Sequence, residues 1–341
     1  MALLLRIRPR RAALAALLSS CWASVPAALA DAGPGAQAVA GPLPWQEPAP
    51  VARLFLQLPF EAPEVVPARA LELEVRLLYS NSLLVAEDEK LALDIHVETA
   101  QPTVFLRYGL APGVEAQLAV PFVVDYGGFL DRPIEIVEGW FDYANPQRQG
   151  RPRNVARYVL ARRGGPALSR EGAGAGLGDI WAGLKVSLAG QGEGAGLAAR
   201  AALKLPTGRL PYGSEELDLG ASVLAGFSWT STAVRLQLDL LIPTSDLPVV
   251  HLETHPYGAL SLGVTRRLGD RVALQLQASG HLSPLAGTGL DQLDDPTAYV
   301  LAGATFALSS RVDLEAGIVE NVFSPYRGTD IAFLAGVRSR P

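Results

Sequence analysis

The sequence predicts an all-β fold, a transmembrane up-and-down antiparallel β-barrel of about twelve strands, with short periplasmic turns and long outer loops. Three observations favour this fold. Apolar and polar residues alternate with a period of two, several predicted strands run for 11–13 residues, and short connections alternate with long ones. The chain of 341 residues is 49% hydrophobic and only 18% charged. After residue 30, however, it has no run of about 18 apolar residues that could form a membrane helix.

The alternation is clearest at Leu71–Leu77, where every odd position is apolar and every even position is charged. Successive side chains of a strand point to opposite faces, so one face is apolar and the other polar. The same pattern predicts the other strands at residues 95–109, 114–124, 180–188, 197–205, 217–229, 234–242, 257–267, 271–282, 298–308, 311–322 and 330–338.

The predicted strand 95–109, which has an outer extension, is less regular than the others. Its apolar positions are odd from Leu91 to Val97 and even from Val104 to Tyr108. The change of parity around Pro102 predicts a bulge or a break there, because a proline interrupts the hydrogen-bonded ladder.

The predicted connections fall into two classes. The long ones are residues 81–94, 125–176, 206–216, 243–256, 283–297 and 323–329. An even number of strands places both chain ends on the short-turn side. A soluble β-sandwich or lipocalin-like barrel, with the apolar face inward, would show the same alternation. Soluble strands average about 5–6 residues, so the strand lengths, together with the mid-strand charges, favour the membrane barrel.

The N-terminus predicts export. A cationic stretch ending at Arg11 precedes the apolar run Ala12–Leu18, and Ala28-Leu29-Ala30 is typical of a signal-peptidase site. We expect residues 1–30 to be a signal peptide of a Gram-negative bacterium, with lipidation of Cys21 as the alternative. Removing this segment takes away four arginines and no acidic residue, so the net charge falls from −5 to −9. That charge argues against nucleic-acid binding.

Two further regions follow in the predicted domain organisation. Residues 31–67 contain eight prolines and predict a periplasmic leader or plug segment, in which Leu54–Leu58 could dock inside the barrel mouth. Residues 68–341 are predicted to form the transmembrane barrel.

Charged residues in the middle of the strands are the main candidate site. Their parity predicts that they line the lumen. They are Arg76, Arg107, Glu115, Asp179, Lys185, Arg200, Lys204, Asp218, Arg235, Asp239, Asp313 and Glu315. One interpretation is an ion-pair network that fills a narrow barrel. The other is a polar path for a small-molecule solute, whose charged walls set selectivity.

The long connection 125–176 is the second candidate region. Residues 133–143 predict a short amphipathic helix, and Trp140, Phe141 and Tyr143 could contact the bilayer, the lumen or a ligand. A basic stretch that includes Arg151 and Arg153 could pair with lipopolysaccharide phosphates. The alternative is a solvated loop with a folded lid.

Enzymatic chemistry is not expected. The His281-Leu282-Ser283 segment resembles the His-x-Ser of outer-membrane lipid hydrolases, but His281 shares the parity of the lumen face, whereas those enzymes place the pair on the lipid side. His251 and His255 lack an evident third ligand for zinc. We therefore expect no catalytic residues, no metal and no cofactor.

Several segments resemble a bacterial family. In chain order they are Gly41–Pro44, Arg107–Leu110, Tyr126–Asp131, Arg151–Asn154, Gly176–Asp179 and Leu203–Gly208. They are similar to domain-of-unknown-function family 3187 and, more distantly, to outer-membrane proteins of phenol-degradation pathways. The resemblance implies an exported outer-membrane barrel and no established activity. The chain departs from many outer-membrane barrels in ending on Arg338–Pro341 rather than on an aromatic residue.

The leading functional hypothesis is passive transport of a small molecule across the outer membrane. A structural or surface-interaction barrel with a closed lumen is the second hypothesis, and a lipid-modifying enzyme is the third. Membrane lipids, lipopolysaccharide among them, are the expected partners.

Overall fold

The computed structural model describes residues 40–140, 145–248, 250–285, 287–321 and 326–340. The predicted signal peptide and Cys21 lie outside these residues. Twelve antiparallel strands close into a barrel, which confirms the predicted fold class. They are β1 Leu71–Glu87, β2 Leu91–Ala111, β3 Val114–Tyr126, β7 Trp181–Ala189, β8 Gly194–Lys204, β9 Asp218–Ser228, β10 Thr232–Pro243, β11 Tyr257–Leu268, β12 Val272–His281, β13 Thr297–Ala307, β14 Val312–Glu320 and β15 Ile331–Ser339.

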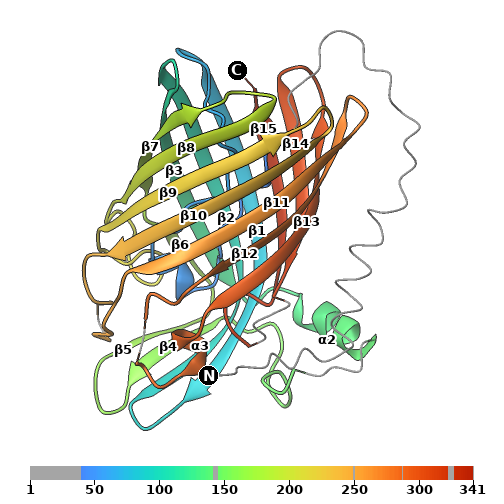
Figure 1. The fold of residues 1–341 in the computed structure, drawn as a ribbon. Coiled ribbons are helices and arrows are strands. Elements are labelled where there is room, and N and C mark those ends of the chain that lie inside the picture. The colour runs from blue at the N-terminus through green and yellow to red at the C-terminus, as the bar shows by residue number, and fades with distance from the viewer. Residues whose placement is uncertain (1–39, 141–144, 249, 286, 322–325, 341) are drawn as a thin grey trace, which may run out of the picture.

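The barrel closes where its first and last strands meet. β1 pairs with β15 in a register from Glu74↔Arg338 to Asn81↔Ile331, and β3 pairs with β7 across the longest connection. Figure 1 shows the short turns at the upper end of the barrel and β4, β5 and α3 at the lower end. The alternation of short and long connections therefore gives the barrel two different ends.

The outside of the barrel wall is apolar. Leu238 in β10 is 50% exposed, and its neighbours across the sheet, Val223 and Leu260, are exposed to a similar extent. Exposed apolar residues occupy equivalent positions on the other strands, among them Leu73, Val104, Phe122, Leu184, Leu262, Leu314, Ile318 and Phe333. An apolar belt of this extent is unusual on a protein surrounded by water and is typical of a lipid-facing wall.

The predicted loop at residues 81–94 is wrong. β1 continues to Glu87 and β2 begins at Leu91, so the two strands form one long hairpin that extends beyond the rest of the barrel. The bulge expected at Pro102 is absent, because Pro102 pairs with Leu77 and the register of this hairpin runs without a shift. The expected break occurs on the other side of β2, where the pairing with β3 skips Gln101 and Pro102.

The change of parity in β2 has a different cause. Leu91, Leu93 and Ile95 point to the same side of the strand as Phe105 and Arg107, and all five are buried. In the extension, the inward face packs into an apolar cluster with Tyr158 and Leu160 instead of facing charged side chains. The polarity of the two faces changes along the strand, whereas the direction of the side chains does not.

The connection between β3 and β7 is folded. It contains α2 Asp131–Trp140, close to the predicted helix, followed by β4 Arg157–Arg162, β5 Ala167–Glu171 and β6 Gly174–Leu177. β4 pairs with the extension of β2 and with β5, and β6 pairs with β3. A second short helix, α3 Asp291–Asp294, lies between β12 and β13. Among the described residues, no helix is both long and apolar enough to cross a membrane.

Candidate functional site: a segment within the barrel lumen

Residues 40–67, here called the plug segment, lie inside the barrel. Figure 1 shows the beginning of the described chain within the ring of strands. Leu43, Leu54 and Leu56 of this segment are almost completely buried, as is Phe60. A single helical turn, η1 Ala52–Leu54, is its regular secondary structure. Its many prolines lack backbone N–H groups, so fewer backbone donors of this segment need a hydrogen-bond acceptor inside the lumen.

The plug segment runs from the short-turn end of the barrel to the long-loop end and back. The Gly41 carbonyl accepts a hydrogen bond from Gln275 near the start of β12, whereas Glu47 bonds His281 at the other end of that strand. On the return, the Val66 N–H donates to Glu115 at the start of β3. Both ends of the segment therefore lie on the short-turn side.

Glycines of the wall make room for the plug segment. A Cβ atom at Gly220 would lie 2.8 Å from the Leu56 side chain, and one at Gly263 would lie 2.7 Å from Phe60. A Cβ at Gly303 would overlap Leu43. Glycine inside a strand often marks such a close approach. Side chains larger than hydrogen at these wall positions would collide with the plug segment.

Glu61 is the electrostatic centre of the plug segment. Its carboxylate lies 3.2 Å from the Arg107 guanidinium, 3.2 Å from Lys185 Nζ and 3.5 Å from the Arg200 guanidinium. Gln117 also donates a hydrogen bond to it at 2.7 Å. All these side chains are buried, so one carboxylate of the plug segment compensates cations from three strands.

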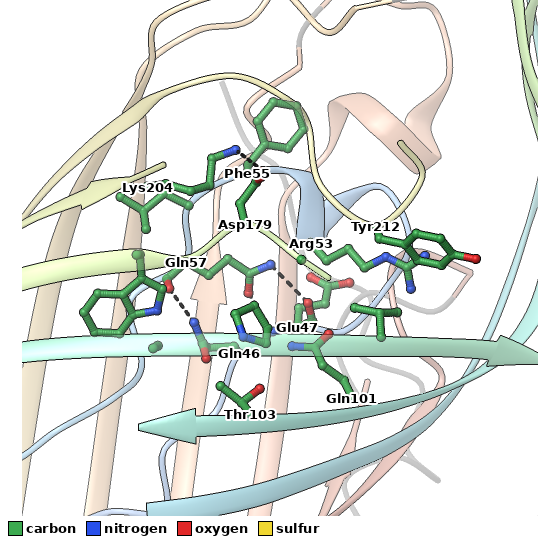
Figure 2. A pocket seen from close by; sticks show the side chains of 16 residues that line it. Gln46, Glu47, Arg53, Phe55, Gln57, Gln101, Thr103, Asp179, Lys204 and Tyr212 are labelled. Atoms are coloured by element: carbon green, nitrogen blue, oxygen red, sulfur yellow. Dashed lines mark hydrogen bonds and ion pairs between the residues drawn. The ribbon is translucent and has the colours of Figure 1, made fainter. Parts of the chain in front are cut away.

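A second group of contacts holds the middle of the plug segment near the long-loop end. Arg53 forms two hydrogen bonds with Asp125 of β3, at 2.6 and 2.8 Å. The Leu56 N–H donates to Asp218 at 2.7 Å, and Lys204 donates to the Leu54 carbonyl. Figure 2 shows Lys204 and Asp179 of the wall beside Phe55 of the plug segment.

All twelve predicted lumen residues lie on the inside of the wall, with at most 8% of each residue exposed. Eight of them contact the plug segment, namely Arg76, Arg107, Glu115, Lys185, Arg200, Lys204, Asp218 and Arg235. The other four, Asp179, Asp239, Asp313 and Glu315, hydrogen-bond other residues of the barrel. The plug segment therefore adds two carboxylates, Glu61 and Glu64, to a network in which wall charges also pair with one another, as Lys185 does with Glu115 and Lys204 with Asp218.

The sequence reasoning did not single out the plug residues that carry these contacts, Glu47, Arg53 and Glu61. They lie in a region without alternation, where period-two analysis has no signal. Their one available signal was that isolated charges interrupt a segment rich in proline and apolar residues.

Cavities lie beside the plug segment on two sides. The larger, about 630 Å³, lies at the short-turn side and is lined by residues of both charges, including Glu64, Arg107, Arg235 and Arg338. The smaller, about 40 Å³, lies near Gln101 and Trp181 and is shown in Figure 2. The two cavities share no lining residue. The plug segment therefore separates the larger cavity, here called the vestibule, from the smaller pocket.

His281 and Ser283, the pair that resembles the His-x-Ser of lipid hydrolases, each bond other residues. His281 Nε2 lies 2.7 Å from Glu47 and 2.8 Å from Thr297, and the Ser283 hydroxyl donates to the Leu293 carbonyl. No hydrogen bond between His281 and Ser283 occurs in this part of the described chain. In the described ranges, no group of three or more His, Cys, Asp or Glu side chains is arranged to hold a metal.

The outer-loop candidates lie on the outside of the long-loop end. Trp140 ends α2 and is 75% exposed. Arg151 pairs with Asp94 at 2.9 Å and Arg153 pairs with Glu135. Phe141 and Tyr143 lie outside the described residues.

Asp131, the first residue of α2, attaches the helix to the wall. It contacts His96 at 2.9 Å, Asn81 at 3.2 Å and Arg148. Burial alone would raise the pKa of Asp131, but the hydrogen bonds from His96 and Asn154 and the nearby Arg148 charge hold this pKa well below its ordinary value. A lowered pKa means that the attachment is stable at neutral pH and is lost only as the pH falls through that lowered value.

The model of the family "Protein of unknown function (DUF3187)" matches residues 18–340. The chain belongs to this family. Among curated proteins, none is detectably similar to the sequence.

The chain is also similar to solved structures of outer-membrane proteins. The outer-membrane channel of Pseudomonas putida F1 is 14% identical, with a TM-score of 0.51, over 81% of this chain and 96% of the other. The NanC porin is 8% identical, with a TM-score of 0.48, over 79% and 99%. The Pseudomonas putida toluene transporter TodX is 10% identical, with a TM-score of 0.37, over 79% and 88%. The first of these likenesses shows that the chain has the fold of an outer-membrane channel.

Proposed function

We propose that this chain is an outer-membrane barrel that lets a small polar solute pass passively, and that the plug segment closes the passage in the state described. One observation carries the proposal. Eight of the twelve wall charges contact the plug segment. Four of them, Arg107, Lys185, Arg200 and Arg235, pair with its carboxylates Glu61 and Glu64, so a separate segment completes a network that the wall charges form only in part among themselves.

The chemistry of the wall fits a passage. Withdrawal of the plug segment would expose cationic and anionic side chains from several strands, a polar lining of the kind that selects solutes by charge and size. Twelve strands lie between eight-stranded barrels, whose interior is filled by side chains, and 16-stranded porins with a water-filled channel. A narrow, solute-sized opening is the expected intermediate.

The vestibule suggests the class of solute. Its volume of about 630 Å³ is within the usual range of ligand pockets, about 300–1,000 Å³. Carboxylates and guanidinium groups line it together, with Phe60 and Trp229 among them. These features fit a small molecule that has polar or charged groups and an apolar part.

A closed barrel that presents its outer region to partners is the second candidate. The complete burial of Leu43 and Leu54 and the folded β4–β5 hairpin support it. A lipid-modifying activity finds no support in the contacts of His281 and Ser283, which we expect to have no catalytic role.

Osmotic swelling of vesicles that contain the complete mature chain tests the proposal. We expect small polar solutes to enter faster than into protein-free vesicles, with a rate that falls as solute size increases and rises linearly with concentration. Linearity identifies passive transport. Swelling no faster than in protein-free vesicles, both for the complete chain and for a folded variant without the plug segment, would exclude a passage and favour the closed barrel.

A further inference from the structure

Helix α2 is amphipathic in an unusual orientation. Pro133, Ile136, Val137 and Trp140 have the spacing i, i+3, i+4, i+7, which places them on one face of a helix. This face points away from the protein, since Ile136 is 48%, Val137 45% and Trp140 75% exposed. A surface helix of a soluble protein normally turns such an apolar stripe towards the core.

The polar face of α2 is the one that contacts the protein. Asp131 is buried against His96 and Asn81 of the wall. Glu138 Oε2 accepts a hydrogen bond from the Asn145 N–H at 3.4 Å, and Glu135 pairs with Arg153. These contacts fix the rotation of the helix, so the outward direction of its apolar stripe is determined by specific polar bonds.

The helix also lies at a defined height on the barrel. It is outside the barrel wall, near the long-loop end, as Figure 1 shows. Just before the helix, Phe129 stacks on Tyr79 with ring centroids 5.7 Å apart, and Tyr79 also contacts Tyr126. Tyr79 has the parity of Leu73 and the other exposed apolar residues of β1. The aromatic cluster therefore continues the apolar belt at its outer edge.

Aromatic residues at the edge of an apolar belt are typical of the membrane–water interface. A helix that lies in the interface turns its apolar face towards the acyl chains and keeps its polar face away from them. Both features occur together here, and the apolar stripe of α2 is adjacent to a surface that faces lipid.

We propose that α2 and Phe129 form an interfacial anchor. The apolar stripe of α2 lies among the acyl chains of the outer leaflet, close to the headgroups, and holds the outer region of the barrel against the membrane surface. This proposal rests on the insertion of the barrel into a membrane. A lipid is favoured over a protein partner because the stripe is continuous with the lipid-facing belt through the Phe129–Tyr79 contact.

Single labelled cysteines test the anchor. The one cysteine of the chain, Cys21, is in the predicted signal peptide, so each variant of the mature protein carries one site. Ile136→Cys is labelled with an environment-sensitive fluorophore in vesicles whose lipids carry a nitroxide either near the headgroup or deep in the acyl region. Leu238→Cys on the wall serves as the deep-lipid control, and Glu89→Cys, exposed at the tip of the β1–β2 hairpin, serves as the water control.

We expect the label at position 136 to be quenched by the shallow nitroxide more than by the deep one, and to be protected from aqueous iodide. The label at 238 should be quenched by the deep nitroxide more than by the shallow one, and the label at 89 should be quenched by iodide alone. If 238 is quenched by lipid while 136 is quenched only by iodide, or by neither agent, the anchor is wrong although the barrel is inserted. If 238 is not quenched by lipid, membrane insertion itself is wrong, and the proposed function fails with it.

Discussion

Replacing Glu61 with glutamine is expected to open the barrel. The substitution keeps the size of the side chain but removes the charge that compensates Arg107, Lys185 and Arg200. Removing one partner of a buried ion pair costs about 3–5 kcal/mol when the remaining charge is left without compensation. Here the cost is at most the lower end of that range, because the three cations keep wall carboxylates within 4 Å, namely Glu72, Glu74, Glu115 and Asp239. The cost applies to the closed state, in which these cations are shielded from water. Every 1.4 kcal/mol is a factor of ten, so the ratio of open to closed barrels should rise by up to roughly 100-fold.

Planar-bilayer recordings measure this ratio directly. Glu61→Gln should produce long open events under conditions in which the unaltered protein is mostly closed. Glu193→Gln is the matched control, since Glu193 lines the same vestibule but is exposed, and its current should equal that of the unaltered protein. If correctly folded Glu61→Gln is as silent as the control, Glu61 does not hold the plug segment in place.

Replacing Leu238 with arginine should strongly destabilise the barrel. Leu238 lies in the middle of β10, on the apolar outer face, between Val223 and Leu260 of the neighbouring strands. An arginine on the lipid face near the bilayer midplane costs about 2–4 kcal/mol, because its charge must be solvated in hydrocarbon. We expect a decrease of this size in the free energy of unfolding from vesicles, followed by urea titration and by the heat-dependent gel mobility of the folded barrel.

Leu308→Arg provides the comparison for this prediction. Leu308 is 59% exposed, compared with 50% for Leu238, but it lies in the short turn between β13 and β14 and not in a strand of the barrel wall. Arginine there should leave the free energy of unfolding almost unchanged. Equal tolerance of arginine at positions 238 and 308 would mean that water, and not lipid, surrounds the belt.

The alternation of the sequence was sufficient to predict the barrel wall. A strand between lipid and a polar lumen has two faces of opposite polarity, so its pattern identifies both the strand and the side on which each charge lies. All twelve lumen candidates are inside for this reason. The outer extension of β1 and β2 was missed because the inward face becomes apolar there, as Leu91 and Leu93 show, and the contrast between the faces is lost.

The plug segment shows where sequence reasoning stops. Glu61 contacts Arg107, Lys185 and Arg200, which are 46 to 139 positions away in the chain, and no local pattern connects them. The segment has little secondary structure of its own and takes its shape from the surrounding wall. Its prolines predicted an extended chain, but its partners emerge only from the three-dimensional arrangement of the strands.

The central claim is that the plug segment closes a lumen that is otherwise continuous. The conductance of the mature chain without the plug segment, residues 40–67, compared with the complete chain in the same planar bilayers, tests it most directly. The account predicts a steady current, proportional to voltage, for the shortened barrel, and rare, brief openings for the complete one. A shortened barrel that folds, inserts and still carries no current would show that the wall closes the lumen without the plug segment, and would contradict the account.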